Sequence, residues 1–148
     1  MMRNFKLTVE YDGTDFFGWQ IQADLRSVQG ELRTAIRSLT GEEVVVHGAG
    51  RTDSGVHAWG QVASFQTERD SLSPKNFLLG LNALTPPDLS VRRVEEVEPG
   101  FHALKSAVGK LYEYRVETGV APSALDRHRV WWYRWEIDLD RMREAALI

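Results

Sequence analysis

The stretch Gly48-Ala-Gly-Arg-Thr-Asp-Ser-Gly-Val-His57 holds three glycines and five polar or charged side chains. The apolar runs Val44–Val46 and Trp59–Phe65 on either side of it have the composition of β-strands. A polar, glycine-rich loop between two strands is suited to placing side chains and backbone groups within reach of a ligand. We therefore interpret this stretch as a candidate functional loop, and the strands around it as part of a sheet.

Arg51 and Asp53 are the charged pair of this loop. Residues two apart in an extended segment point to the same side, so the two side chains can pair. A carboxylate held by a guanidinium stays ionised and oriented, as a nucleophile requires. Asp-Ser-Gly is also common turn chemistry, and most Arg–Asp pairs in loops are structural. The loop by itself leaves both interpretations open.

The spacing of apolar residues predicts strands and helices in the order β-α-β-β-α-β. Helix starts are indicated by Ser27 and by Ser73-Pro74, and a helix end by Gly41. The predicted elements are strand Phe5–Tyr11, helix Ser27–Thr40, strand Glu43–His47, strand Trp59–Gln66, helix Pro74–Leu84 and strand Asp88–Val97. This order predicts an α+β fold that is ferredoxin-like, or RRM-like, with an antiparallel sheet and helices on one face.

Two further strands are predicted at Leu111–Glu117 and Val130–Ile137, and a helix begins after Asp138. We place a domain boundary between residues 1–107 and 108–148. The loop Asp12–Arg26 is long and rich in aromatic residues, so it is either functional or held against the body by those side chains.

Composition restricts the class of protein. The chain has 148 residues, a formal net charge of −3 and no cysteine, which excludes disulfides and cysteine metal sites. Its four histidines lack metal-ligand spacing, so we expect no metal. No apolar run approaches a membrane span, and we expect a soluble cytoplasmic protein without membrane contact. Local clusters of positive charge around Lys105 and Arg127 are either an RNA-binding surface or ordinary solvated charge.

The octet Gly50–His57 resembles the signature of the tRNA pseudouridine synthase A family. Four other segments resemble further motifs of that family in the right order, so the similarity spans most of the chain. They are Tyr11-Asp-Gly-Thr-Asp-Phe-Phe-Gly-Trp-Gln20, Ser27-Val-Gln-Gly30, Phe101-His-Ala103 and Lys110-Leu-Tyr-Glu-Tyr114.

The resemblance implies specific roles. It makes Asp53 the nucleophile, Arg51 the residue that orients it, and Tyr112 the residue that stacks on the uracil and helps remove its C5 proton. From the residues alone, Tyr112 reads as a core tyrosine on a strand. The resemblance also implies an RNA-binding segment, for which we expect contacts from Phe101, His102, Ala103, Leu104, Lys105 and Lys110. The family usually has arginine at the position of Leu104 and an aromatic residue at the position of Lys105, which weakens the assignment there.

The activity that the resemblance implies is conversion of uridine to pseudouridine in the anticodon stem-loop of tRNA, without a cofactor. It further implies a homodimer, and a chain that is the N-terminal half of a longer enzyme. Two other classes stay open. A non-catalytic RRM-like RNA-binding module would share the fold, and a carboxylate glycosidase would need a second carboxylate beside Asp53.

Overall fold

The computed structural model describes residues 2–147. These residues form two compact units, of which the first extends to Gly109 and the second begins at Lys110. Each unit is described by itself below. Within residues 2–147, every helix is too short or too polar to cross a lipid bilayer.

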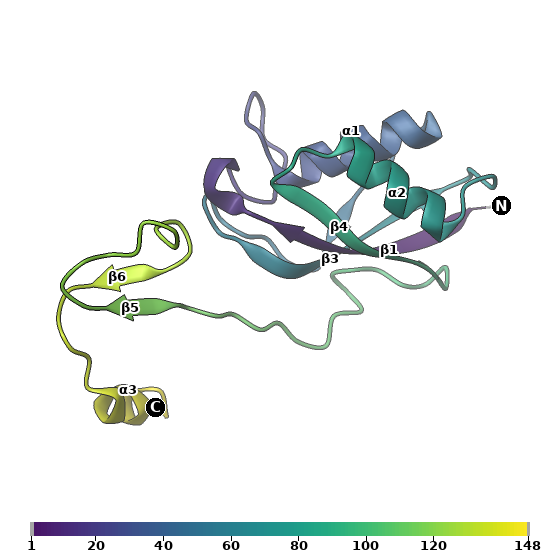
Figure 1. Ribbon diagram of the computed structural model, residues 1–148. Helices are drawn as coiled ribbons and strands as arrows, with labels where there is room; N and C mark the ends of the chain where they lie inside the picture. Colours follow the sequence, from purple (N-terminus) through teal and green to yellow (C-terminus); the bar gives the residue numbers. More distant parts are fainter. Residues whose placement is uncertain (1, 148) are drawn as a thin grey trace. The chain divides into compact units, whose positions relative to one another are not determined.

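The first unit is a four-stranded antiparallel sheet with two helices on one face (Figure 1). In chain order its elements are β1 (Arg3–Tyr11), the short 3₁₀ helix η1 (Gly13–Asp15), α1 (Val28–Thr40), β2 (His47–Gly48), β3 (Ala58–Thr67), α2 (Pro74–Leu84) and β4 (Leu89–Val97). The strands lie in the order β2-β3-β1-β4. The predicted α+β fold with helices on one face of an antiparallel sheet is confirmed.

The core of this unit lies between the helices and one face of the sheet. Alternate residues of β1, namely Phe5, Leu7 and Val9, are fully buried. The ring of Phe5 packs at 5.5 Å from Phe65 of β3 and at 4.7 Å from Phe77 of α2. Burying each such side chain stabilises the fold by about 1.5–3 kcal/mol, so this alternation fixes which face of the sheet the helices cover.

Both long helices have the ends that the sequence predicts. The Ser27 hydroxyl accepts a hydrogen bond from the Gly30 amide, and α1 stops at Gly41, which has a φ of +77°. Ser73 and Asn76 cap the start of α2 reciprocally. Local capping chemistry thus sets these boundaries.

The second strand differs from the prediction. We expected it at Glu43–His47, but only His47 and Gly48 pair with β3. The Val46 carbonyl accepts a hydrogen bond of 2.7 Å from the Gln29 side-chain amide, and the side chains of Val44 and Val46 are buried, so the segment before His47 is held against α1 and the core.

The second unit holds two short parallel strands, β5 (Val116–Thr118) and β6 (Trp131–Tyr133), and the helix α3 (Leu139–Ala145). The predicted strands Leu111–Glu117 and Val130–Ile137 are therefore too long. Only three residues of each predicted strand pair with the other strand. An extended segment that pairs with no neighbouring strand does not count as a β-strand. The helix start predicted at Asp138 is confirmed, because its carboxylate accepts hydrogen bonds from two amides of the first turn.

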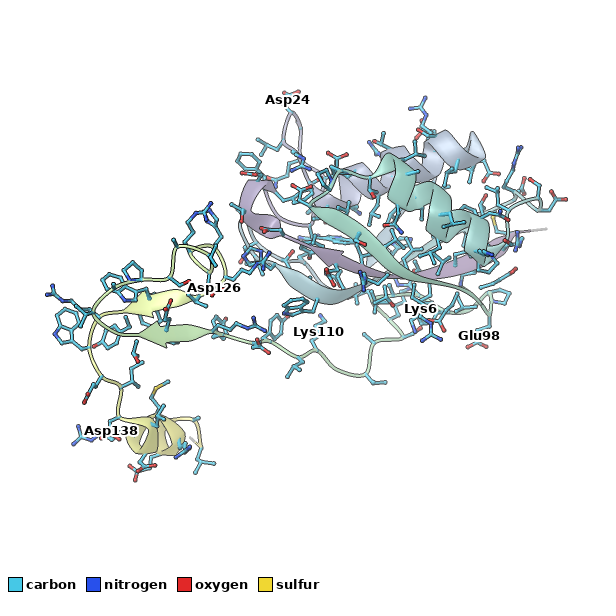
Figure 2. The ribbon with its side chains drawn as sticks, viewed as in Figure 1. Lys6, Asp24, Glu98, Lys110, Asp126 and Asp138 are labelled. Atoms are coloured by element: carbon cyan, nitrogen blue, oxygen red, sulfur yellow. The ribbon has the colours of Figure 1, made fainter. Side chains whose placement is uncertain are left out.

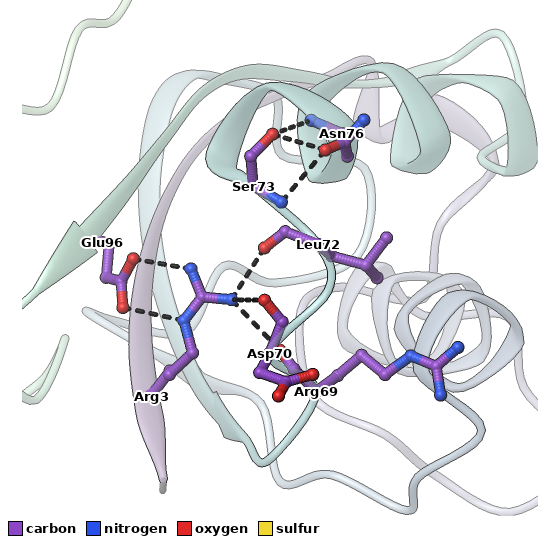
Figure 3. A network of polar contacts seen from close by, with 7 residues as sticks. All are labelled: Arg3, Arg69, Asp70, Leu72, Ser73, Asn76 and Glu96. Carbon is purple, nitrogen blue, oxygen red and sulfur yellow. Dashed lines mark hydrogen bonds and ion pairs between the residues drawn. The ribbon is translucent and has the colours of Figure 1, made fainter.

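Arg3 of β1 connects the neighbouring strand β4 to the loop before α2 (Figure 3). Its guanidinium donates two hydrogen bonds to the Glu96 carboxylate, at 2.8 and 2.7 Å. It also donates to the Leu72 carbonyl at 2.8 Å, and to the carbonyls of Arg69 and Asp70 at 3.1 and 3.3 Å. The hydrogen bonds from Arg3 lower the pKa of Glu96 below its ordinary value of 4.5.

We predict that Arg3→Lys lowers the free energy of unfolding by about 1–2 kcal/mol, because a lysine cannot hold the carboxylate and the carbonyls at once. Arg37→Lys is the control, since its pair with Glu43 is exposed on both sides and such pairs contribute about 0–1 kcal/mol. Urea denaturation measures both variants.

The Arg3 effect should depend on pH. A carboxyl whose pKa is lowered by folding stabilises the folded state above its unfolded pKa and loses this contribution as the pH falls through the folded pKa. The difference between Arg3→Lys and the unmodified protein should therefore shrink below about pH 4.5. An equal difference at pH 7 and pH 3 would contradict this account.

Candidate active site

The candidate loop joins β2 to β3 and is closed by a tight turn. The Asp53 carbonyl accepts a hydrogen bond of 3.2 Å from the Val56 amide, and Gly55 has a φ of +81°. A positive φ at the third turn residue is the mark of a type II turn and favours glycine. The Asp-Ser-Gly turn expected from the sequence is therefore present, and it places Asp53 at the first turn position.

Arg51 and Asp53 both have exposed side chains. Between residues 2 and 147, no ion pair joins the Arg51 guanidinium to the Asp53 carboxylate, so the expected contact is not formed in this structure. Both charged groups remain accessible to a ligand, and neither is committed to holding the loop in place.

The segment that follows β1 holds the loop from one side through main-chain contacts. The Trp19 amide donates to the Thr52 carbonyl at 2.9 Å, and the Gly55 amide donates to the Phe16 carbonyl at 3.3 Å. The rings of Phe16 and Trp19 are each 2% exposed, whereas Phe17 is half exposed. Two of the three aromatic residues therefore hold the long loop against the body of the unit. This agrees with one of the two explanations that the sequence offered for the aromatic residues of this loop.

Two side chains of the sheet, the buried Tyr11 and the half-buried Gln61, hold the candidate loop from the other side. The Tyr11 hydroxyl lies 2.8 Å from Thr52 Oγ1, and the Gln61 amide donates to the Gly50 carbonyl at 2.8 Å. Burial raises the pKa of the Tyr11 phenol, against the opposing effect of its hydrogen bonds to Thr52 and Gln61, so the hydroxyl keeps its proton at neutral pH. Sequence reasoning missed both residues as site elements, although Tyr11 begins one of the recognised motifs.

A second segment, residues 98–106, is held on the face of the sheet opposite the helices. The buried Asn4 side chain donates to the carbonyls of Glu98 and Phe101, at 2.8 and 2.9 Å. The buried Ser64 hydroxyl accepts from the Ala103 amide at 3.0 Å. Ala103 is only 2% exposed, so it anchors this segment. Sequence reasoning missed Asn4 and Ser64, which carry no motif of their own.

The exposed end of the same segment carries the side chains for which the sequence predicts RNA contacts. Leu104 and Lys105 are exposed, while His102 is half buried and its ring lies 4.3 Å from that of His47. Partial burial, together with the charges of His102 and Lys105, lowers the pKa of His47. In the described part of the chain, no three histidine or acidic side chains gather in a way that could hold a metal.

Tyr112 and Lys110 belong to the second unit. Tyr112 is 66% exposed and precedes β5, so the expectation of a core tyrosine on a strand is wrong. The roles implied for Tyr112 in catalysis and for Lys110 in RNA binding stay proposals. Figure 2 shows Lys110 at the start of this unit.

The fold and the loop place the chain among α+β proteins with a polar loop beside the edge strand of an antiparallel sheet. A family model described as tRNA pseudouridine synthase matches residues 7–104, which include the whole candidate loop. The chain therefore belongs to the tRNA pseudouridine synthase family.

Curated relatives support the same membership. The chain is 47% identical over 146 residues to a protein of Bradyrhizobium diazoefficiens named tRNA pseudouridine synthase A. It is 46% and 44% identical, over 145 residues each, to proteins of the same name from Geobacter sulfurreducens and Acetivibrio thermocellus. Each match covers 98% of this chain but 59% of the relative, so the chain spans about three fifths of their length.

We predict that Ser64→Ala weakens the hold on residues 98–106, because the buried Ala103 amide loses its acceptor. The expected cost is about 1–2 kcal/mol of folding free energy, with faster amide hydrogen exchange at Ala103. Ser38→Ala is a matched control, since the Ser38 hydroxyl donates only to a carbonyl of its own helix and is exposed. Unchanged exchange at Ala103 would show that Ser64 is not the anchor.

Proposed function

We propose that this chain belongs to a tRNA pseudouridine synthase A that converts uridine to pseudouridine in the anticodon stem-loop of tRNA. The observation that carries this proposal is Asp53, which is exposed on a loop held from two sides and lies within the region that the family model matches. Three relatives carry the same printed name.

The reaction is an isomerisation. The N1–C1′ bond of the uridine breaks and a C5–C1′ bond forms, while C5 loses a proton and N1 gains one. No atom is added or removed, so no oxidant, reductant or energy source is consumed. Asp53 supplies the nucleophile, which attacks either C6 of the base or C1′ of the sugar. Arg51 orients the Asp53 carboxylate by its charge, and Tyr112 stacks on the uracil and assists loss of the C5 proton.

The proposed partner is tRNA. A uridine in a stem must be flipped out to reach a carboxylate, which costs a few kcal/mol, and contacts to the flanking phosphates would offset that cost. Exposed Lys105 and Lys110 are suited to such contacts, with Phe101, His102 and Leu104 beside Lys105. We also propose that the full-length protein works as a homodimer in the cytoplasm, and that residues 108–148 begin its second half.

The two other classes receive less support. A non-catalytic RNA-binding module has no use for a charged loop held this closely. A glycosidase needs a second carboxylate, but the Asp12 carboxylate accepts hydrogen bonds from the amide and hydroxyl of Thr14, which gives it a capping role.

We predict that Asp53→Asn in a full-length synthase carrying these residues lowers turnover by roughly 10⁴-fold or more, because the amide is not a nucleophile. Tritium release from C5-labelled uridine in tRNA measures turnover. The fold and the affinity for tRNA should survive, since exposed loop substitutions usually change stability by less than about 0.5 kcal/mol.

The matched control is Asp24→Asn, an exposed aspartate at the tip of the loop before α1 (Figure 2). Its φ of 60° suits asparagine as well as aspartate. This variant should keep full activity. Near-native turnover of Asp53→Asn would remove Asp53 from the chemistry, and unfolding would indicate a structural carboxylate instead.

We predict that a double variant, Lys105→Glu and Lys110→Glu, binds tRNA more weakly and with a smaller salt dependence. Each lost phosphate contact should lower the slope of log K against log salt by about 0.7–0.9. Lys75→Glu, at an exposed position of α2, is the control and should change the slope much less. Equal slopes for the double variant and the control would exclude these two lysines from the interface.

A further inference from the structure

Residues 50–53 alternate between anchored and free positions. Gly50 is held through its carbonyl by the Gln61 amide, and Thr52 is held through its hydroxyl by Tyr11, each at 2.8 Å. Arg51, between the two anchors, and Asp53, directly after the second, have exposed side chains. The anchors therefore determine the direction in which both charged side chains leave the loop.

The second anchor is the stronger of the two because Thr52 is held on both sides. Its carbonyl accepts the Trp19 amide at 2.9 Å while its hydroxyl meets Tyr11. Gly18 has a φ of +84°, and a Cβ there would lie 2.5 Å from the Thr52 carbonyl oxygen and 3.2 Å from the Asp53 carbonyl carbon. The backbone of the aromatic-rich loop thus lies directly against the peptide that joins Thr52 to Asp53.

Tyr11 is suited to hold a fixed position. It is 3% exposed, it ends the central strand β1, and its ring packs edge-on against Phe16 at 6.3 Å. Because the phenol is buried and keeps its proton, its hydroxyl can donate to the Thr52 oxygen at the pH at which the enzyme works. Strand, phenol and loop form one rigid connection that leads from the core to Asp53.

We propose that Tyr11 is a positioning residue for Asp53, acting through its hydrogen bond to Thr52. This inference rests on the proposed function, since it assumes that Asp53 is the nucleophile. Tyr11 does not touch the substrate in this scheme. It keeps the Asp53 backbone in the one arrangement from which the carboxylate can reach the flipped uridine, and a small displacement of a reacting group lowers the rate strongly.

A purely structural role is the competing explanation, because the bond also satisfies a buried hydroxyl. The two explanations differ in what they affect. A structural bond contributes to stability alone, whereas a positioning bond contributes to kcat beyond any change in stability. The test must therefore separate turnover from unfolding.

The test is a double-mutant cycle in the full-length synthase, with Tyr11→Phe, Thr52→Val and the double variant. Each single variant should lower kcat about tenfold or more and leave KM and tRNA affinity within about twofold. The double variant should lower kcat no further than a single one, because either change removes the same bond. Thr52→Ser, which keeps the hydroxyl, should retain most of the activity.

Thr40→Val is the matched control. The buried Thr40 hydroxyl, at the end of α1 and outside the candidate loop, donates to the Ile36 carbonyl at 2.9 Å and accepts from the Glu42 amide at 3.1 Å. It should lose as much stability as Thr52→Val while keeping its kcat. If Tyr11→Phe does not fold, Thr52→Val decides the same question at a position that is only half buried.

The results of these experiments distinguish the proposed nucleophile role of Asp53 from the proposed positioning role of Tyr11. If Asp53→Asn is inactive but Tyr11→Phe and Thr52→Val keep their kcat, the positioning role is wrong and the proposed function stands. Rate losses that multiply in the double variant would also overturn the positioning role. If Asp53→Asn stays active, both the nucleophile and its positioning are wrong.

Discussion

The side chains of the central strand β1 alternate between two faces, and each face contacts a different part of the first unit. The other features of this unit depend on that alternation. One face carries the buried apolar residues that pack beneath the helices, and Tyr11 continues that alternation at the end of the strand. The other face carries Asn4, which holds the residue 98–106 segment. A shift of the strand by one residue would exchange the two faces. It would remove the core contacts, the contact of Tyr11 with the candidate loop and the hydrogen bonds of Asn4 together.

This arrangement separates the residues that stabilise from the residues that could react. Thr52 and Gly50 are held by the body of the unit, so Arg51 and Asp53 need no partner within the described chain to keep the loop in shape. Charged groups that are free of structural ion pairs can meet a charged substrate without first breaking a contact. A loop of this kind is suited to chemistry on a polyanion.

The segment after β4 shows the same division of roles. Ala103 is buried against Ser64, and this places Leu104 and Lys105 at the surface next to the His47–His102 pair. The proposed contact with RNA is compatible with the net charge of −3, because the local arrangement of charge decides where a phosphate backbone is attracted.

The sequence by itself determined the order of elements, the ends of both long helices and the candidate loop, because capping residues and apolar periodicity act over a few neighbouring positions. Only the tertiary structure decided that β2 is two residues long, that Tyr112 precedes a strand, and that Arg51 and Asp53 do not pair. It alone also brought Tyr11 to Thr52 and Ser64 to Ala103. These contacts join residues 41 and 39 positions apart, so they depend on how the strands pack and leave no local pattern in the chain.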